Sequence, residues 1–368
     1  MNYLELDTPA LIIDRDVMMR NIRDMQAHAD RCGVSLRPHT KTHKMPALAK
    51  LQREAGCKGI AVAKIGEAEV MAENGLDDIF IANEPVGEIK MKRLRALAEK
   101  VAVSWGIDCP EHVDAAEKAF AGGAKKAEVL IEIEVGENRS GIIEEADFIR
   151  LLEALKKAPH VHLKGVFSHD GNSYSAPSLE ACRESFVESQ KRTLRFVELA
   201  RENGFECATV SIGSTPSLMH DFPILPGITE FRPGTYILMD ASMANAAGTL
   251  DRCAATVLAT VISRPTPERV ILDVGAKGIT MQSRSKGITA TPGLGTIKGW
   301  DDVHIYAVYD EHAIIYSKAF RDGVRIGDKV EIIPVHICPT VNLQESAYLV
   351  SNGEVLEEIP VLCRGKLK

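Results

Sequence analysis

The chain has 368 residues, of which 45% are hydrophobic and 26% are charged, and its formal net charge is −7. This composition predicts a folded protein with a sizeable core rather than a disordered chain. Because binding to nucleic-acid phosphates requires a basic surface, the acidic balance predicts no nucleic-acid partner.

The amino terminus has no basic segment followed by an apolar run, and no segment is long and apolar enough to span a bilayer. We therefore expect a cytoplasmic protein with no membrane partner. The eight cysteines show no CxxC spacing in a chain too long to need disulfide staples. We interpret seven of them as reduced, mostly buried thiols, and treat Cys338 separately below.

From residue 10 to about residue 240, short apolar runs alternate with amphipathic segments that end at glycine. This alternation predicts an α/β protein with parallel strands and crossover helices. No GxGxxG motif follows any strand, so a closed (β/α)8 TIM-type barrel is favoured over an open doubly wound sheet. The expected strands are 10–14, 34–40, 59–64, 78–83, 101–107, 128–135, 162–169 and 208–213.

After residue 240 the pattern changes to β-rich runs separated by Gly, Asp and Pro turns. This change predicts a second, mostly antiparallel β domain. We assign residues 11–242 to the barrel, and residues 243–368 together with residues 1–10 to the β domain.

Lys41 lies where the predicted strand 34–40 ends, the position at which barrels place their active-site residues. It follows Arg37 and His39, and three neighbouring basic groups repel one another unless an anion lies nearby. A lysine shielded by apolar neighbours can form a Schiff base with an aldehyde cofactor. A solvated surface lysine is the alternative, but we favour a functional role for Lys41 and, less strongly, for Lys44.

Two glycine-containing turns are suited to binding a phosphate group. Gly213 allows a close approach of the backbone, and Ser214 and Thr215 add two hydroxyl groups. By itself this run is more often an ordinary turn between a strand and a helix. Gly234 and Tyr236 belong to a second turn that closes the same pocket or simply ends a strand.

His336 and Cys338 are two residues apart, so in an extended segment their side chains point to the same side. Imidazole and thiolate together suit Zn²⁺, and two protein ligands leave coordination positions for substrate and water. In isolation, a core thiol beside an unrelated histidine is the favoured interpretation of this pair.

Taken in order, these segments resemble the D-threonine aldolase and D-serine dehydratase family, whose members have an alanine-racemase-like fold and use pyridoxal 5′-phosphate. The resemblance covers nearly the whole chain. It rests on TPALIIDRDVMMRNI, LRPHTKTHK, GIAVAKIGEAEVMAENGLDDIFIAN, IEVGENRSGI, SHDGNSY, VSIGSTPS, ITEFRPGTYILMD, DEHA and PVHICPTVNL.

This resemblance implies a role for each matching residue. Lys41 is implied to bind the cofactor covalently and to act in catalysis, and Arg139 to face the cofactor ring and its phenolic oxygen. His169, which we also expect to be catalytic, and Tyr174 are implied to contact the ring. The implied phosphate-binding residues are Gly213, Ser214, Thr215, Gly234 and Tyr236, and the implied ligands of a divalent metal (Zn, Mn or Mg) are His336 and Cys338.

The resemblance also implies a lyase acting on small D-3-hydroxy amino acids, as a homodimer with its active site near the subunit interface. We expect a D-threonine aldolase that yields glycine and acetaldehyde. The alternative is a D-serine or D-3-hydroxyaspartate dehydratase that yields a 2-oxo acid and ammonia. A racemase is disfavoured because it has no hydroxyl for a metal to activate, and a non-catalytic PLP-binding protein would have no need of the metal pair.

Two segments depart from the family pattern, and both affect the expected substrate more than the expected cofactor. Residues 275–287 read GAKGITMQSRSKG where the family commonly has a glycine- and serine-rich segment with an acidic residue. Residues 310–313 read DEHA, where glycine often follows the histidine.

Overall fold

The computed structural model describes residues 1–368 and divides into two compact units. The barrel unit contains residues 25–41, 46–234 and 365–368, and the β unit contains residues 1–24, 42–45 and 235–364. One of the points at which the chain passes between the units lies between Lys41 and Thr42.

The barrel unit is built around a parallel sheet of eight strands in the order β2-β9-β8-β7-β6-β5-β4-β3. A parallel bridge between His39, just after β2, and Ala61 in β3 joins the two ends of this order. The sheet therefore closes on itself, and the predicted barrel is confirmed. Its strands are β2 (Ser35–Leu36), β3 (Ile60–Val62), β4 (Asp78–Ile81), β5 (Ala102–Ile107), β6 (Ala127–Ile133), β7 (Val161–Ser168), β8 (Thr209–Ile212) and β9 (Glu230–Phe231).

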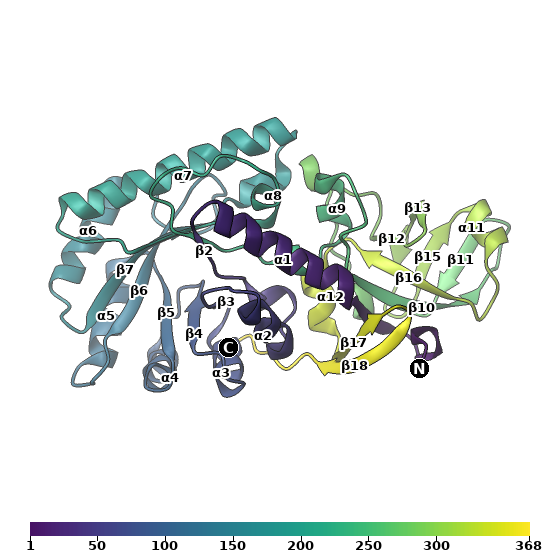
Figure 1. Ribbon diagram of the computed structural model, residues 1–368, viewed down its shortest axis with the longest axis horizontal. Helices are drawn as coiled ribbons and strands as arrows, with labels where there is room; N and C mark the ends of the chain where they lie inside the picture. The colour runs from purple at the N-terminus through teal and green to yellow at the C-terminus, as the bar shows by residue number, and fades with distance from the viewer. The chain divides into compact units, whose positions relative to one another are not determined.

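Helices connect these strands, and Figure 1 shows α3 to α7 on the outside of the sheet. The helix α7 illustrates how the sequence sets their ends, because Ser178 Oγ accepts a hydrogen bond of 3.1 Å from Ala181 N at its start. At its end, Gly204 takes a φ of 83°, which suits glycine. The helices are α1 (Arg15–Arg31), α2 (Pro46–Glu54), α3 (Ile65–Glu73), α4 (Glu88–Ala98), α5 (Pro110–Phe120), α6 (Glu145–Lys156), α7 (Leu179–Glu202) and α8 (Thr215–Leu218), with the 3₁₀ turns η2 (Thr40–Thr42) and η3 (Gly171–Ser175).

A small aromatic cluster fills the interior between four barrel strands. Ala61, Phe80, Leu130 and Phe167 are buried together, and the rings of Phe80 and Phe167 meet edge to face with centroids 5.0 Å apart. These side chains come from β3, β4, β6 and β7. Their packing holds these four strands together, and polar residues lie at the carboxyl ends of these strands.

The β unit contains ten strands, and every pair of neighbours in it is antiparallel except β1 with β17. The predicted mostly antiparallel β domain is therefore confirmed. Its strands are β1 (Ala10–Asp14), β10 (Ala255–Ser263), β11 (Arg269–Leu272), β12 (Gly295–Ile297), β13 (Trp300–His304), β14 (Ala307–Val308), β15 (Ala313–Tyr316), β16 (Lys329–Pro334), β17 (Ser346–Ser351) and β18 (Glu354–Pro360). Its helices are α9 (Ala241–Ala247), α10 (Ala276–Ile279), α11 (Lys318–Gly323) and α12 (Ile337–Leu343), with η1 (Tyr3–Glu5), η4 (Thr235–Ile237) and η5 (Gly287–Thr289).

The prediction that residues 10–14 form a barrel strand was wrong. This segment is β1, which pairs antiparallel with β10 and parallel with β17 in the sheet of the β unit. Its apolar run followed by a helix matches the strand–helix repeat of a barrel. Only its long-range pairing shows that the strand belongs to the β unit. The missing barrel strand is β9, whose two residues, Glu230 and Phe231, are too few to show a strand pattern.

No helix of the structure has both the length and the apolar character needed to cross a membrane.

We predict that Gly165→Ala destabilises the barrel by roughly 2–4 kcal/mol, because strain and overpacking act together. Gly165 in β7 has a φ of 152°, and a Cβ there would lie 1.8 Å from the carbonyl oxygen of Thr209. Urea unfolding in a Trp300→Phe background, where Trp105 in β5 is the remaining tryptophan, reports on the barrel alone.

The matched control is Gly122→Ala, at a φ of 70° with no atom within 4 Å of the added Cβ. This substitution should lower the free energy of unfolding by only about 1 kcal/mol, because the backbone there is strained but the added Cβ meets no neighbour. Equal losses in the two variants would contradict the close approach of β7 and β8.

Candidate active site

The predicted cofactor-binding residues of the barrel unit all lie after the carboxyl ends of its strands. Lys41 is in η2 after β2, and Arg139 is in the loop after β6. His169 directly follows β7, and Gly213 directly follows β8. Because the strands are parallel and the sheet is closed, these loops meet at one end of the barrel. The remaining members of this group at that end are Tyr174, Ser214, Thr215 and Gly234.

His169 is held in a charged network that the sequence did not reveal. Its Nδ1 lies 2.8 Å from Glu137 Oε2, and a carboxylate can only accept, so Nδ1 carries the hydrogen. Arg139 pairs with Glu137 at 3.4 Å and with the buried Glu132 at 3.3 Å. The ring of His169 stacks with that of Tyr174, with centroids 6.4 Å apart and an interplanar angle of 15°.

The histidine of this network is uncharged at neutral pH. Burial lowers the pKa of His169 to about 4, and the positive charges of Arg139 and Lys41 act in the same direction, against the opposing effect of Glu137. The protonated Nδ1 leaves Nε2 with the lone pair of the neutral ring.

Cationic groups converge around His39, two residues before Lys41. Burial lowers the pKa of His39 well below its usual value, and the charges of Lys41, Arg232 and Arg139 lower it further. Arg232 is buried inside the barrel, where its guanidinium lies 5.2 Å from the ring centroid of Phe167. These cations favour an anionic group beside His39.

The turn after β8 has the features of an anion cradle. Gly213 has a φ of 127°, which residues with a side chain rarely adopt, and a Cβ there would also lie 2.5 Å from Leu218 Cδ1, so the turn favours glycine. The hydroxyl of Thr215 is buried without a hydrogen-bond partner. A buried polar atom of this kind normally has a partner, and a phosphate oxygen supplies one.

The other hydroxyls of this turn bind Asp170, directly after the catalytic candidate His169. Ser217 Oγ donates to Asp170 Oδ2 at 2.6 Å, and Ser214 Oγ donates to the same oxygen at 3.1 Å. Burial raises the pKa of Asp170 to about 6, although these two hydrogen bonds oppose the rise. Asp170 thus ties the loop after β7 to the loop after β8.

Glu84 and Glu132 form a carboxyl pair at the same end of the barrel. Burial raises the pKa of Glu84, and the hydrogen bond and charge of Glu132 raise it further. The Glu84 carboxyl therefore keeps its proton at neutral pH, and its neighbour Glu132 is the residue that contacts Arg139.

Sequence reasoning missed five residues of this network: Glu84, Glu132, Glu137, Asp170 and Arg232. A signal was present for two of them. Glu132 interrupts the apolar residues of β6, and Arg232 follows β9 inside the FRPGTY segment, where only the turn was interpreted. Polar residues at interior positions of a strand need a partner when they are buried, and this requirement marks them as part of a network.

Tyr236, His336 and Cys338 belong to the β unit. The prediction that His336 and Cys338 lie in an extended segment was wrong, because His336 is the N-cap of α12 and Cys338 lies in its first turn. Pro339 is compatible with the first turn of a helix. The apolar run before it resembles a continuing strand, so the sequence did not show that a helix begins here. His336 Nδ1 contacts Gln282 Oε1, which accepts its hydrogen, and Thr42 Oγ1 lies 3.3 Å from Cys338 Sγ.

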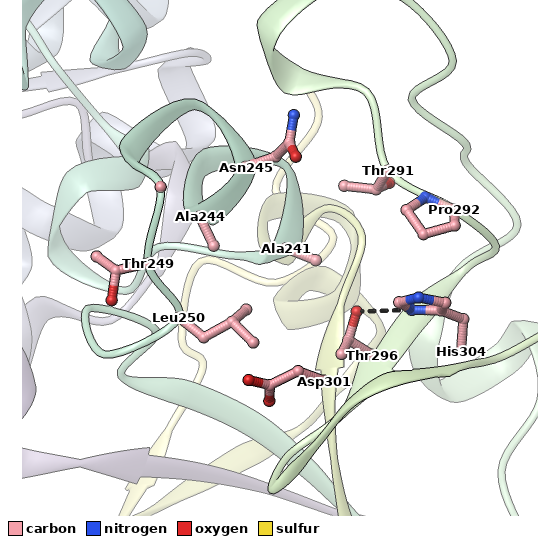
Figure 2. A pocket seen from close by; sticks show the side chains of 11 residues that line it. Ala241, Ala244, Asn245, Thr249, Leu250, Thr291, Pro292, Thr296, Asp301 and His304 are labelled. Carbon is pink, nitrogen blue, oxygen red and sulfur yellow. Dashed lines mark hydrogen bonds between the residues drawn. The ribbon is translucent and has the colours of Figure 1, made fainter.

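A separate pocket of about 360 Å³ lies beside α9 in the β unit, and none of the predicted site residues lines it. Figure 2 shows Asp301 and His304 among its polar residues, with His304 Nδ1 3.1 Å from Thr296 Oγ1.

Comparison with known proteins agrees with the order of the two units along the chain. Residues 13–242 match the family described as alanine racemase, N-terminal domain, and residues 254–350 match a putative serine dehydratase domain. A D-threonine aldolase from Arthrobacter sp. is 32% identical, over 98% of this chain and 93% of that protein. A D-threo-3-hydroxyaspartate dehydratase from Delftia sp. HT23 is 33% identical, over 96% of each chain.

Solved structures give the same result. The crystal structure of D-threonine aldolase from Filomicrobium marinum has a TM-score of 0.89 at 28% identity, and the match covers 100% of this chain and 98% of that one. Two variants of a D-threo-3-hydroxyaspartate dehydratase, each covering 98% of this chain at 27% identity, have TM-scores of 0.90 and 0.91. One is a cysteine-to-alanine variant in the metal-free form, and the other is a histidine-to-alanine variant. The resemblance predicted from the motifs is thus confirmed, and the chain belongs to the alanine racemase-like family, with an alanine racemase-type barrel followed by a serine dehydratase-type domain.

Proposed function

We propose that the protein is a pyridoxal-phosphate- and metal-dependent lyase of D-3-hydroxy amino acids that cleaves D-threonine to glycine and acetaldehyde. The observation that carries this proposal is the convergence of Lys41, Arg139 and the Gly213–Thr215 turn at one end of the barrel. We also propose that the protein acts in the cytoplasm and that it is a homodimer with its active site near the subunit interface, the assembly that the family resemblance implies.

The residues at the barrel end fit pyridoxal phosphate. The cofactor carries an aldehyde, a phenolic oxygen and a phosphate group, and the chain offers a lysine, an anchored arginine and a buried hydroxyl. The unsatisfied Thr215 hydroxyl and the cations around His39 both favour an anion here. Gly234 and Tyr236 follow in the next turn, and we propose that they complete the phosphate site.

The bound cofactor supplies a conjugated ring that accepts the electron pair of the substrate bond that breaks. The chain's own residues do the rest. Lys41 Nζ would hold the aldehyde carbon, and Arg139, which Glu132 and Glu137 hold in place, would donate to the phenolic oxygen. His169 would present a neutral ring to the cofactor because burial lowers its pKa, whereas Glu137, which holds Nδ1, opposes that shift.

His336 and Cys338 fit a divalent metal of the zinc class. Both side chains are partly accessible, and the contact with Gln282 keeps the hydrogen of His336 on Nδ1, which leaves Nε2 as the ligand atom. The two substituted residues of the dehydratase variants stand two positions apart, the spacing of His336 and Cys338. A metal here would supply a Lewis acid toward the substrate hydroxyl.

Two reactions compete at such a site, and they differ in the proton that is removed. In the aldolase reaction, His169 Nε2 would take the proton of the 3-hydroxyl, the Cα–Cβ bond would break to release acetaldehyde, and a proton would be added to Cα to give glycine. In the dehydratase reaction, Lys41 Nζ takes the α-proton, and the hydroxyl leaves. The 33% identity to a hydroxyaspartate dehydratase keeps the second reaction as the alternative function.

Product analysis separates these functions. With D-threonine, we expect glycine and acetaldehyde in equal amounts, and no product from L-threonine, the stereochemical control. Formation of 2-oxobutyrate and ammonia, or of pyruvate from D-serine, would instead assign the dehydratase. Cofactor binding without any of these products would show a non-catalytic PLP-binding protein.

We predict that Lys41→Ala abolishes the visible absorption band of lysine-bound cofactor and lowers kcat by about 10²–10⁴-fold, since the amine also transfers protons. The matched control is Lys44→Ala, three residues away, which should keep the band. Chelation of the metal should remove turnover in the wild-type enzyme and leave the band in place. A band that survives in Lys41→Ala would overturn the assignment.

We predict that His169→Gln weakens the acid sensitivity of the apoprotein. As the pH falls from 7 to 5, the unfolded chain binds a proton at this histidine near its ordinary pKa, whereas the folded chain, with a pKa of about 4, does not. Wild type therefore loses stability over this interval, and the variant should lose about 1–2 kcal/mol less. Urea unfolding at both pH values measures the difference.

The matched control for this pH experiment is His162→Gln, because the side chain of His162 is 56% exposed on β7. It should lose as much stability as wild type between the two pH values. An identical loss in His169→Gln would show that His169 is not held neutral by burial.

A further inference from the structure

The junction between β5 and α5 gathers three side chains of metal-binding type. Asp108 follows β5, Cys109 is the N-cap of α5 with an extended φ of −149°, and His112 lies in the first turn. Their ligand atoms all lie within 4.8 Å of one another, and each residue is partly accessible to solvent. This DCxxH cluster belongs wholly to the barrel unit, whereas His336 and Cys338 belong to the β unit.

The backbone explains why these side chains meet. Pro110 occupies the first helical position, so the helix begins immediately after Cys109. Residues 108 and 112 are one helical turn apart, and Asp108 Oδ1 lies 3.2 Å from His112 Nδ1. The thiol between them therefore faces a carboxylate and an imidazole rather than an apolar core.

Without a metal, the Cys109 thiol keeps its proton at neutral pH. Burial is the main cause that raises the pKa of the Cys109 thiol to about 11, and the Glu111 carboxylate contributes to this rise. A divalent cation reverses this preference, because a metal-bound sulfur releases its proton to solvent and becomes a thiolate.

We propose that Asp108, Cys109 and His112 form a second metal site, which takes a zinc-class divalent ion. The combination of sulfur, nitrogen and oxygen ligands matches Zn²⁺ and excludes Mg²⁺ and Ca²⁺, which require oxygen ligands. Around a tetrahedral zinc the ligand atoms are about 3.3–3.8 Å apart. Side-chain rotations that move the ligand atoms by about 1 Å would therefore bring these three residues to the distances of a zinc site. This site is independent of the proposed lyase reaction.

The position of the cluster gives the ion a structural role. The Asp108 carboxylate also accepts a hydrogen bond from the backbone N–H of Gly141, which helps to lower its pKa. Gly141 lies two residues after Arg139, in the loop that carries this arginine. An ion on Asp108 would therefore clip the loop after β5 to the loop after β6.

Zinc content tests the proposal. Full-length protein is stripped with a chelator, loaded with Zn²⁺, passed through a desalting column and analysed by atomic mass spectrometry. In a Cys338→Ser background we expect one tightly bound zinc per chain, which is lost on adding Cys109→Ser or His112→Gln. Serine keeps the N-cap preference, so Cys109→Ser should fold, and circular dichroism checks this.

A competition titration with a chromophoric chelator gives the affinity, which should fall more than about tenfold in each variant. Cys32→Ser, another partly accessible cysteine, is the control and should keep the zinc. With Co²⁺ in the cofactor-free Cys338→Ser protein, a sulfur-to-cobalt absorption band should appear and should disappear with Cys109→Ser. Zinc content and cobalt spectra that do not depend on Cys109 and His112 would overturn the site, and would leave the proposed lyase function untouched.

Discussion

The closure of the parallel sheet between β2 and β3 is the constraint on which the candidate site depends. Ala61 N donates to Pro38 O at 2.8 Å, and His39 N donates to Pro233 O at 2.9 Å. The same short segment thus joins β3 on one side and the end of β9 on the other. Lys41 lies two residues after this joint. Without the closure, the loops after the other strands would have no common centre, and Lys41 would have no fixed relation to Arg139 or His169.

The balance of charged groups differs between the two ends of the barrel interior. Arg37 is balanced by two carboxylates, with 2.8 Å contacts to Asp78 and to Glu230. Toward the carboxyl ends of the strands, Lys41, Arg139 and Arg232 all raise the local potential at His39. Buried charges are costly unless they are paired. Arg232 donates to the Ser211 hydroxyl and the Ser168 carbonyl rather than to a carboxylate, so the anionic cofactor that we propose would help to balance its charge.

Much of this arrangement follows from sequence patterns alone, because strand and helix periodicity and glycine caps are local. The alternation of strands and helices placed Lys41 and Arg139 after predicted strands and His169 at the end of another, whereas the roles of Arg139 and His169 came from the family resemblance. What the sequence could not show depends on long-range pairing. β1 looks like a barrel strand until its partners β10 and β17 are known, and β9 is too short to leave a pattern.

The charged network was also beyond local reasoning. Glu137 and Asp170 are ordinary polar loop residues in the sequence, and their roles appear only when the loops after β6, β7 and β8 meet. The His336–Cys338 pair shows the opposite case. Residue type and spacing alone favoured an unrelated thiol and histidine, and the family resemblance implied the metal pair, whereas the backbone that presents these residues is a helix start rather than a strand.

The central claim is that the amine of Lys41 carries the aldehyde cofactor at the open end of the barrel. The most direct test is to reduce the cofactor-loaded protein with borohydride, digest it and map the pyridoxyl group by mass spectrometry. The account predicts a single modified lysine at position 41, with the nearby Lys44 unmodified. Modification of Lys44, of a lysine on the barrel's outer helices, or of many lysines to a small extent would contradict it.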